Sequence, residues 1–221
     1  MNKKSVFSAV IWDLDGTLTD TIQDLAEAAN AALRIHGLPT HATDKYRKMV
    51  GNGVRALLKM AVGEGASNEI KYAIMADYAR LYDEGCLNFT RPYPGVVDVI
   101  NTLRGRGVIQ LVVTNKPQAQ AEKIVAALFP EESFSVIVGQ RDGVPTKPDP
   151  FGTLSALRGV GVTPDRTLFV GDSDVDMITA GNAGIKGAGV CWGFRGRDEL
   201  AAAGADYLVE NAAELLEIVC G

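Results

Sequence analysis

Short apolar runs, rich in β-branched and aromatic residues, recur along this chain and alternate with segments of helical periodicity. The two strongest are SVFSAVIW at 5–12 and VIQLVVT at 108–114. Further runs lie at 134–138, 167–170, 186–190 and 205–209. A nearly continuous apolar run of this length predicts a strand that is buried on both faces, as in a parallel sheet. The alternation with helices predicts an α/β fold, built on a doubly wound, Rossmann-like parallel sheet.

Residues 20–85 interrupt this alternation, because they contain helical patterns and no convincing strand. The segment Thr21-Ile22-Gln23-Asp24 resembles a capping box, and the helical stripe that follows it ends at Gly37 and Pro39. Shorter helices are expected at 43–50, 53–62 and 67–84. The pattern predicts a small all-helical cap domain at 19–88, inserted into an α/β core domain made of 1–18 and 89–221.

The composition narrows the class of protein. The 221 residues carry a formal net charge of −5, which argues against a general nucleic-acid binder because such proteins usually have a basic face. The three cysteines show no C-x-x-C spacing, as expected for reduced thiols. No apolar stretch is long enough to cross a bilayer. We therefore expect a cytoplasmic monomer or homodimer with neither nucleic-acid nor membrane partners.

Polar residues that could carry chemistry follow the predicted strands. Asp13-Leu14-Asp15-Gly16-Thr17 comes after the first strand, and Thr114-Asn115-Lys116 comes after the second. Lys147 lies beyond the third strand, and the fourth leads into Gly171-Asp172-Ser173-Asp174-Val175-Asp176. Ligands of open α/β sheets bind outside the carboxyl ends of the strands. We therefore expect carboxylates, a hydroxyl and an ammonium group to meet at one edge of the sheet.

Such a set of groups suits phosphate chemistry. Crowded Asp side chains repel one another unless a cation joins them, and hard oxygen ligands select Mg²⁺, which also binds substrate phosphates. Lys147, the hydroxyl of Thr114 and backbone N–H groups near Asn115 could stabilise a bound phosphate. Asp13 could attack the phosphorus as a nucleophile. Asp15 could protonate the leaving alkoxide and later deprotonate the attacking water.

Each segment also has an ordinary structural interpretation. A D-x-D-G sequence is most often a turn, Gly171-Asp172 is a common strand-to-loop junction, and Thr114-Asn115 could cap a helix. A Lys-Pro pair alone means little. The combination favours function, because four separate segments would otherwise have placed these groups at matching strand ends by accident.

In this order the segments resemble the four motifs of the haloacid dehalogenase superfamily. They are Asp13-Leu14-Asp15-Gly16-Thr17-Leu18, Thr114-Asn115-Lys116, Lys147-Pro148, and Gly171-Asp172 with Asp176. The resemblance covers the whole chain and includes a helical cap after the first motif. Two aspartates, at 13 and 15, indicate the phosphatase branch, because the dehalogenases lack the second. The resemblance implies hydrolysis of a small phosphorylated metabolite through an aspartyl-phosphate, with Mg²⁺ as cofactor.

The resemblance also implies a role for each motif residue. Asp13 would be the nucleophile and a metal ligand. Asp15 would be the acid/base and would offer the metal its backbone carbonyl, while Asp172 would be the other metal ligand. Asp176, rather than Asp174, would be a carboxylate just outside the ligand shell. The phosphate-binding residues would be Thr114, Asn115 and Lys147, with Lys147 also steadying Asp13.

Within the superfamily the sequence is similar to phosphoglycolate phosphatases, through the segments 50–54 (VGNGV) and 91–96 (RPYPGV). Gly51 and Gly53 flank a turn that opens a helix, and a helix N-terminus attracts anions. This turn could hold the carboxylate of a substrate such as 2-phosphoglycolate. A plain turn between helices is an equal alternative. The residues concerned are Gly51, Asn52 and Gly53, with Arg55 or Lys48 assisting.

Other functions remain open at this point. A sugar-phosphate mutase of the β-phosphoglucomutase type would share the fold, the cap and the aspartyl-phosphate, and a broad sugar-phosphate or nucleotide phosphatase would share all of the chemistry. A phospho-accepting receiver domain also gathers Asp, Thr and Lys with Mg²⁺, but it has no helical insert. A catalytically silent binding protein would have no need of every charged motif residue.

Overall fold

A six-stranded parallel sheet forms the centre of the described chain. The computed structural model describes residues 6–221, so residue 5 of the predicted 5–12 strand lies outside the described part. The strands are ordered β5-β4-β1-β6-β7-β8, and every pairing among them is parallel. The predicted doubly wound α/β fold is confirmed. The strands are β1 Ala9–Trp12, β4 Ile109–Pro117, β5 Val136–Gln140, β6 Thr167–Gly171, β7 Lys186–Val190 and β8 Tyr207–Val209.

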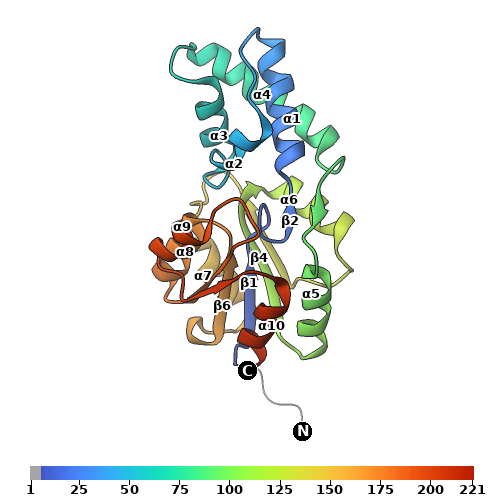
Figure 1. The fold of residues 1–221 in the computed structure, drawn as a ribbon, viewed down its shortest axis with the longest axis vertical. Coiled ribbons are helices and arrows are strands. Elements are labelled where there is room, and N and C mark those ends of the chain that lie inside the picture. Colours follow the sequence, from blue (N-terminus) through green and yellow to red (C-terminus); the bar gives the residue numbers. More distant parts are fainter. Residues whose placement is uncertain (1–5) are drawn as a thin grey trace.

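Helices cover both faces of this sheet (Figure 1). Successive residues of a strand point to opposite faces, so Val10 and Trp12 of β1 belong to one apolar cluster and Ala9 and Ile11 to another. The first cluster includes residues of α5 Val96–Gly105, α6 Gln118–Leu128 and α10 Ala212–Cys220. The second includes residues of α7 Phe151–Val160 and α8 Asp174–Ala183. A 3₁₀ turn at Pro164–Arg166 precedes β6, and α9 Arg197–Ala202 packs beside β7 and β8.

A helical insert, which we define as α1 to α4, lies above the sheet in Figure 1. Its helices are α1 Ile22–Ile35, α2 Thr43–Arg47, α3 Gly53–Val62 and α4 Asn68–Gly85. Two short strands, β2 Thr19–Asp20 and β3 Arg91–Pro92, pair antiparallel where the chain leaves and re-enters the sheet region. The insert therefore begins and ends close to the predicted limits of 19 and 88, and its division from the core as a separate domain stays a prediction.

The predicted capping box at the start of α1 is wrong. Thr21 makes no side-chain cap. Asp24 instead accepts hydrogen bonds from the backbone N–H groups of Phe89 and Thr90 and from the Thr90 hydroxyl, at 2.7 to 3.1 Å. Because this carboxylate is buried, its bonds to the return segment contribute more than a cap exposed to water would. Asp24 thus fastens the beginning of the insert to its end.

Among the described residues, no helix is both long enough and apolar enough to span a membrane.

Candidate active site

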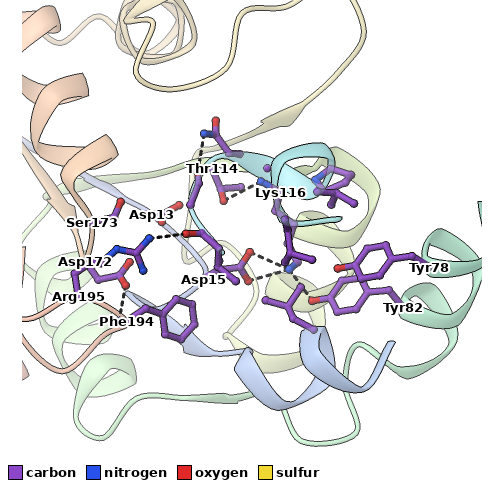
Figure 2. Close-up of a pocket in the computed structure, with 18 residues that line it drawn as sticks. Asp13, Asp15, Tyr78, Tyr82, Thr114, Lys116, Asp172, Ser173, Phe194 and Arg195 are labelled. Carbon is purple, nitrogen blue, oxygen red and sulfur yellow. Dashed lines mark hydrogen bonds and ion pairs between the residues drawn. The ribbon is translucent and has the colours of Figure 1, made fainter. Parts of the chain in front are cut away.

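The site lies between the ends of β1, β4 and β6 and the helical insert, whose Tyr78 and Tyr82 lie on one side of it in Figure 2. Asp13 follows β1 directly, and its backbone N–H donates to the carbonyl of Val170 at 2.9 Å. Asp172 follows β6, and Thr114 lies near the end of β4. The carboxyl ends of parallel neighbours share one edge of a sheet, so three segments far apart in the sequence deliver their polar side chains to one place.

Three buried carboxylates form the centre of the site. Asp13, Asp172 and Asp176 each offer an oxygen, and these oxygens all lie within 4.8 Å of one another. Asp176 belongs to the first turn of α8, and one of its oxygens accepts from the N–H and the hydroxyl of Ser173 at 3.0 and 2.6 Å. The role expected for Asp176, a carboxylate just outside the ligand shell of a metal, stays a prediction. Like charges at this spacing in a dry site are unfavourable unless cations neutralise them.

Lys147 supplies one of those cations. Its Nζ lies 2.8 Å from Oδ1 of Asp13 and 2.6 Å from Oδ1 of Asp176. Burial lowers the pKa of Lys147, but the two carboxylates outweigh it and leave the pKa above its usual value. Oδ1 of Asp13 is buried, and the ammonium of Lys147 is its charged neighbour.

One ammonium group does not balance three carboxylates. Burial raises the pKa of Asp13 to about 6, although Lys147 opposes the rise. Burial, followed by repulsion from Asp176 and Asp13, raises the pKa of Asp172 well above its usual value. A divalent cation would remove this repulsion. The all-oxygen donor set fits such an ion, with Asp13 and Asp172 as its side-chain ligands.

Asp172 is held in place by the loops on either side of it. Its Oδ1 accepts from the hydroxyl of Thr17 at 3.2 Å, and its Oδ2 accepts from the backbone N–H of Phe194 at 2.7 Å. Gly16 has a φ of +86°, and a Cβ there would lie 2.2 Å from Oδ2 of Asp172. Only glycine allows the Asp13–Leu18 loop to pass this close to the carboxylate.

The three predicted phosphate-binding residues meet at this edge in different ways. Thr114 lines the pocket, and its hydroxyl accepts from the N–H of Lys116 at 3.3 Å. The side chain of Asn115 is fully used within the protein. Its Oδ1 accepts a hydrogen bond from the backbone N–H of Lys147 at 2.8 Å. Its Nδ2 donates to the backbone carbonyls of Lys147 and Gly51 at 3.0 and 2.9 Å. Asn115 therefore holds Lys147 in position, and only its backbone is left for a phosphate.

The helical insert closes the other side of the pocket, which is mainly apolar. Of the predicted contacts on the insert, Gly51 and Gly53 line the pocket. Asn52 and Arg55 do not line it and are exposed, as is Lys48, so the structure does not bring these three side chains to the site. The apolar lining consists of Leu25, Val50, Val54, Leu57, Tyr78, Tyr82, Pro117 and Phe194.

Arg195 reaches the insert from the sheet side, and the sequence analysis missed it. Its guanidinium donates to the backbone carbonyls of Arg47 and Val50, the latter at 2.8 Å, and pairs with Glu199 at 2.9 Å. Phe194 and Arg195 both line the pocket. They lie in the loop that follows β7, so the strand-end rule would have found them if it had been applied to the 186–190 run as well.

No role was predicted from the sequence for Lys116 or Tyr82 either, although Lys116 belongs to the motif Thr114-Asn115-Lys116. Lys116 Nζ lies 2.8 and 3.0 Å from the two carboxylate oxygens of Asp15 and 2.6 Å from the hydroxyl of Tyr82. Figure 2 shows Asp15 facing Lys116 and Tyr82, on the side away from Asp172. Lys116 is 101 residues from Asp15 and 34 residues from Tyr82 of α4 in the sequence, and no local pattern predicts such contacts.

Comparisons with known proteins agree with this geometry. Residues 10–190 match the haloacid dehalogenase-like hydrolase family. The chain is 34% identical to the N-acetylmuramic acid 6-phosphate phosphatase of Pseudomonas aeruginosa, over 98% of this chain and 96% of that one. It is 33% identical to phosphoglycolate phosphatase 1 of the same organism, over 94% and 78%. A crystal structure of a predicted phosphoglycolate phosphatase from Haemophilus somnus superposes with a TM-score of 0.89 at 28% identity, covering 96% of this chain and 98% of that one.

The chain belongs to the haloacid dehalogenase-like hydrolase family. Within that family it is a phosphoglycolate phosphatase-like protein, and its similarity to named phosphatases extends over nearly its whole length.

Proposed function

We propose that this protein is a Mg²⁺-dependent phosphomonoester hydrolase that acts on 2-phosphoglycolate or a similar small phosphorylated metabolite. One observation carries the proposal: Asp13 lies in a buried cluster of carboxylates with Asp172 and Asp176, and the ammonium of Lys147 lies 2.8 Å from its Oδ1. Asp15 opens into the same pocket. A nucleophile, a cation site and an acid/base are thus gathered around one space.

The proposed reaction has two steps. A carboxylate oxygen of Asp13 attacks the phosphorus, the phosphorus–oxygen bond to the alcohol breaks, and the departing oxygen takes a proton from Asp15. Water then attacks the aspartyl-phosphate while Asp15 takes its proton, which releases phosphate and restores Asp13. The Mg²⁺ ion, held by the side chains of Asp13 and Asp172 and the carbonyl of Asp15, would offset repulsion between the anionic nucleophile and the anionic ester.

Lys147 and Thr114 are the proposed phosphate ligands on this chain. Lys147 already faces Asp13, so its ammonium can neutralise phosphate oxygens beside the nucleophile. The hydroxyl of Thr114 accepts only one backbone hydrogen bond, and its own hydrogen can be donated. The backbone N–H of Asn115 would complete the set, because its side chain is occupied in holding Lys147. Donors fixed in this way need little reorganisation when charge develops on the phosphate.

The choice of substrate rests on the insert and on the relatives. Helix α3 begins at Gly53, which lines the pocket, so its free N–H groups are available to an anion. Two of the relatives are named for N-acetylmuramic acid 6-phosphate and phosphoglycolate. Both compounds are phosphate monoesters that also carry a carboxylate. We therefore propose a carboxylate-bearing substrate, with its phosphate at Asp13 and its carboxylate toward Gly51 and Gly53.

The three cysteines at 86, 191 and 220 are free thiols, which suits a reducing compartment such as the cytoplasm.

A phosphate-release screen tests the proposal. The panel should hold 2-phosphoglycolate, N-acetylmuramic acid 6-phosphate, a hexose 6-phosphate, a nucleoside monophosphate and p-nitrophenyl phosphate. Each is assayed with Mg²⁺, with EDTA, and with EDTA followed by excess Mg²⁺. We expect release that needs Mg²⁺ and a kcat/KM highest for a carboxylate-bearing ester. Isomerised hexose phosphate without free phosphate would support a mutase instead, and activity in EDTA would contradict the metal.

A further inference from the structure

The side chain of Lys116 uses all three of its N–H donors inside the protein. Two go to the carboxylate oxygens of Asp15 at 2.8 and 3.0 Å, and one goes to the hydroxyl of Tyr82 at 2.6 Å. Only 2% of the lysine side chain is exposed, against 12% for Asp15. A lysine that is buried this deeply costs free energy unless it is fully paired, and here it is. It grips both oxygens of one carboxylate.

These contacts cross from the sheet to the helical insert. Asp15 lies just after β1, and Lys116 is near the end of β4. Tyr82 belongs to α4 of the insert. The ammonium of Lys116 lies 4.6 Å from the centre of the Tyr82 ring, as its hydrogen bond to the hydroxyl of that ring requires. The tyrosine is buried as well. Tyr82 can therefore hold Lys116, the partner of Asp15, only while the insert lies over the sheet.

We propose that Lys116 is the positioning residue of Asp15, and that Tyr82 ties this placement to the closed position of the insert. The inference rests on the proposed function, in which Asp15 exchanges protons with the leaving group and with water. It adds a cause for the order of events: the acid/base is aimed correctly once the insert has enclosed the substrate. The insert thereby contributes to proton transfer as well as to enclosure.

A misplaced acid harms some substrates more than others, and this difference makes the inference testable. An alkyl phosphate expels an alkoxide, which needs a proton as it leaves, so the rate of the first step depends on where Asp15 stands. A p-nitrophenyl phosphate expels a stable phenolate that needs no proton. The ratio of the two rates therefore reports the placement of Asp15, whereas a general loss of folded protein lowers both rates equally.

Tyr78 provides a matched control on the same helix. Its ring stacks on that of Tyr82, with the ring centres 5.5 Å apart and the planes 5° from parallel. Both rings are buried, and the hydroxyl of Tyr78 has no hydrogen-bond partner within residues 6–221. The changes Tyr82→Phe and Tyr78→Phe remove the same atom from neighbouring rings, but only the first removes a bond to Lys116.

The experiment measures single-turnover rate constants, with enzyme in excess, for the best alkyl ester of the panel and for p-nitrophenyl phosphate. We expect Tyr82→Phe to slow the alkyl ester about ten-fold more than the aryl ester, the effect of one hydrogen bond to a charged group. Lys116→Met should widen the difference to about a hundred-fold, the range of a general acid, and Lys116→Arg should recover part of it. Tyr78→Phe should change the rates for the two esters by the same factor, so that their ratio stays at the wild-type value.

Equal effects of the two tyrosine variants on the rate ratio would overturn the inference, as would a Lys116→Met enzyme that loses both activities in proportion. If Lys116→Met does not fold, the comparison of Tyr82→Phe with Tyr78→Phe decides the question alone. A wild-type protein that hydrolyses neither ester would overturn the proposed function, and the inference with it. This failure differs from a failure of the inference alone, because it is seen in the wild-type protein without any variant.

Discussion

Gly193 passes so close to Asp172 that a Cβ on the glycine would lie 2.2 Å from the Cβ of the aspartate. The same Cβ would meet the carbonyl oxygen of Gly16 at 2.4 Å. The next residue, Phe194, donates its backbone N–H to Asp172. The loop after β7 is therefore packed directly against the proposed metal ligand, although no motif of the family was expected there.

Gly193→Ala is predicted to disturb the metal site. The added methyl group must displace either Asp172 or the Gly16 carbonyl, and overpacking of this kind typically costs about 1–3 kcal/mol. We expect weaker Mg²⁺ binding and at least a ten-fold lower kcat/KM, a change of about 1.4 kcal/mol. The control is Gly196→Ala, where a Cβ meets nothing within 4 Å. Titrating activity with Mg²⁺ compares them, and equal behaviour would show that the close contact has no consequence.

Asp13→Asn is predicted to abolish hydrolysis of every ester while the protein stays folded. The amide is a poor nucleophile but has nearly the same shape as the carboxylate. It also removes one negative charge from a crowded cluster, so the thermal midpoint without metal should not fall. Phosphate release and thermal unfolding are measured on the same preparation. Turnover above background in a clean preparation would contradict the role assigned to Asp13.

The effect of Mg²⁺ on stability is predicted to depend on pH. Burial raises the pKa of Asp13 from 3.8 to about 6 and that of Asp172 well above its usual value. The folded protein then holds protons that the unfolded chain has already released, so metal-free stability falls as pH rises from about 4 through 6. Mg²⁺ binds the ionised pair and should raise the thermal midpoint more near pH 7.5 than near pH 5.

Asp172→Asn serves as the control for that measurement. At neutral pH this change should raise the thermal unfolding midpoint of the metal-free protein, because it removes a buried charge. It should also abolish the rise in that midpoint on addition of Mg²⁺. A midpoint that rises with Mg²⁺ equally at both pH values would contradict the assignment of the cluster as the metal site.

Arg195→Lys is predicted to loosen the helical insert. A planar guanidinium can donate to the carbonyls of Arg47 and Val50 at once, whereas a single ammonium cannot reproduce this geometry. Loss of one hydrogen bond to a charged group costs about 1.5–3 kcal/mol, so KM should rise about ten-fold or more. Amide hydrogen exchange at 47–54 should quicken.

The matched change is Arg197→Lys, on an exposed arginine that pairs with Glu210 and does not touch the insert. It should leave both KM and hydrogen exchange at 47–54 near the wild-type values. If the two variants behave alike, Arg195 does not hold the insert.

Local patterns were sufficient for the six strands of the parallel sheet and for the motif residues at its edge. The buried apolar runs became parallel strands, and because parallel strands end at one edge, Asp13, Thr114 and Asp172 could be placed together before any coordinates. Lys147 followed from the same rule, since its segment leads from β5 into α7. These inferences needed only periodicity and the geometry of a parallel sheet.

Local sequence patterns could not predict contacts between segments that are far apart in the sequence. Asp24 looks like part of a helix cap in sequence, yet a stronger set of donors at Phe89 and Thr90 captures it. Lys116 could have bound a phosphate, and only the packing of α4 shows that Asp15 and Tyr82 occupy all three of its donors. Which of several polar partners a buried group takes depends on tertiary packing, which local sequence does not contain.

The central claim is that Asp13 carries the phosphoryl group between the two steps, and trapping that group is its most direct test. Asp15→Asn lacks the base that activates water but can still accept phosphate from p-nitrophenyl phosphate, whose leaving group needs no proton. Acid quenching followed by peptide mass spectrometry should find the phosphoryl group on Asp13. Finding it on another residue, or finding steady turnover with no phosphorylated protein at any time, would contradict the account.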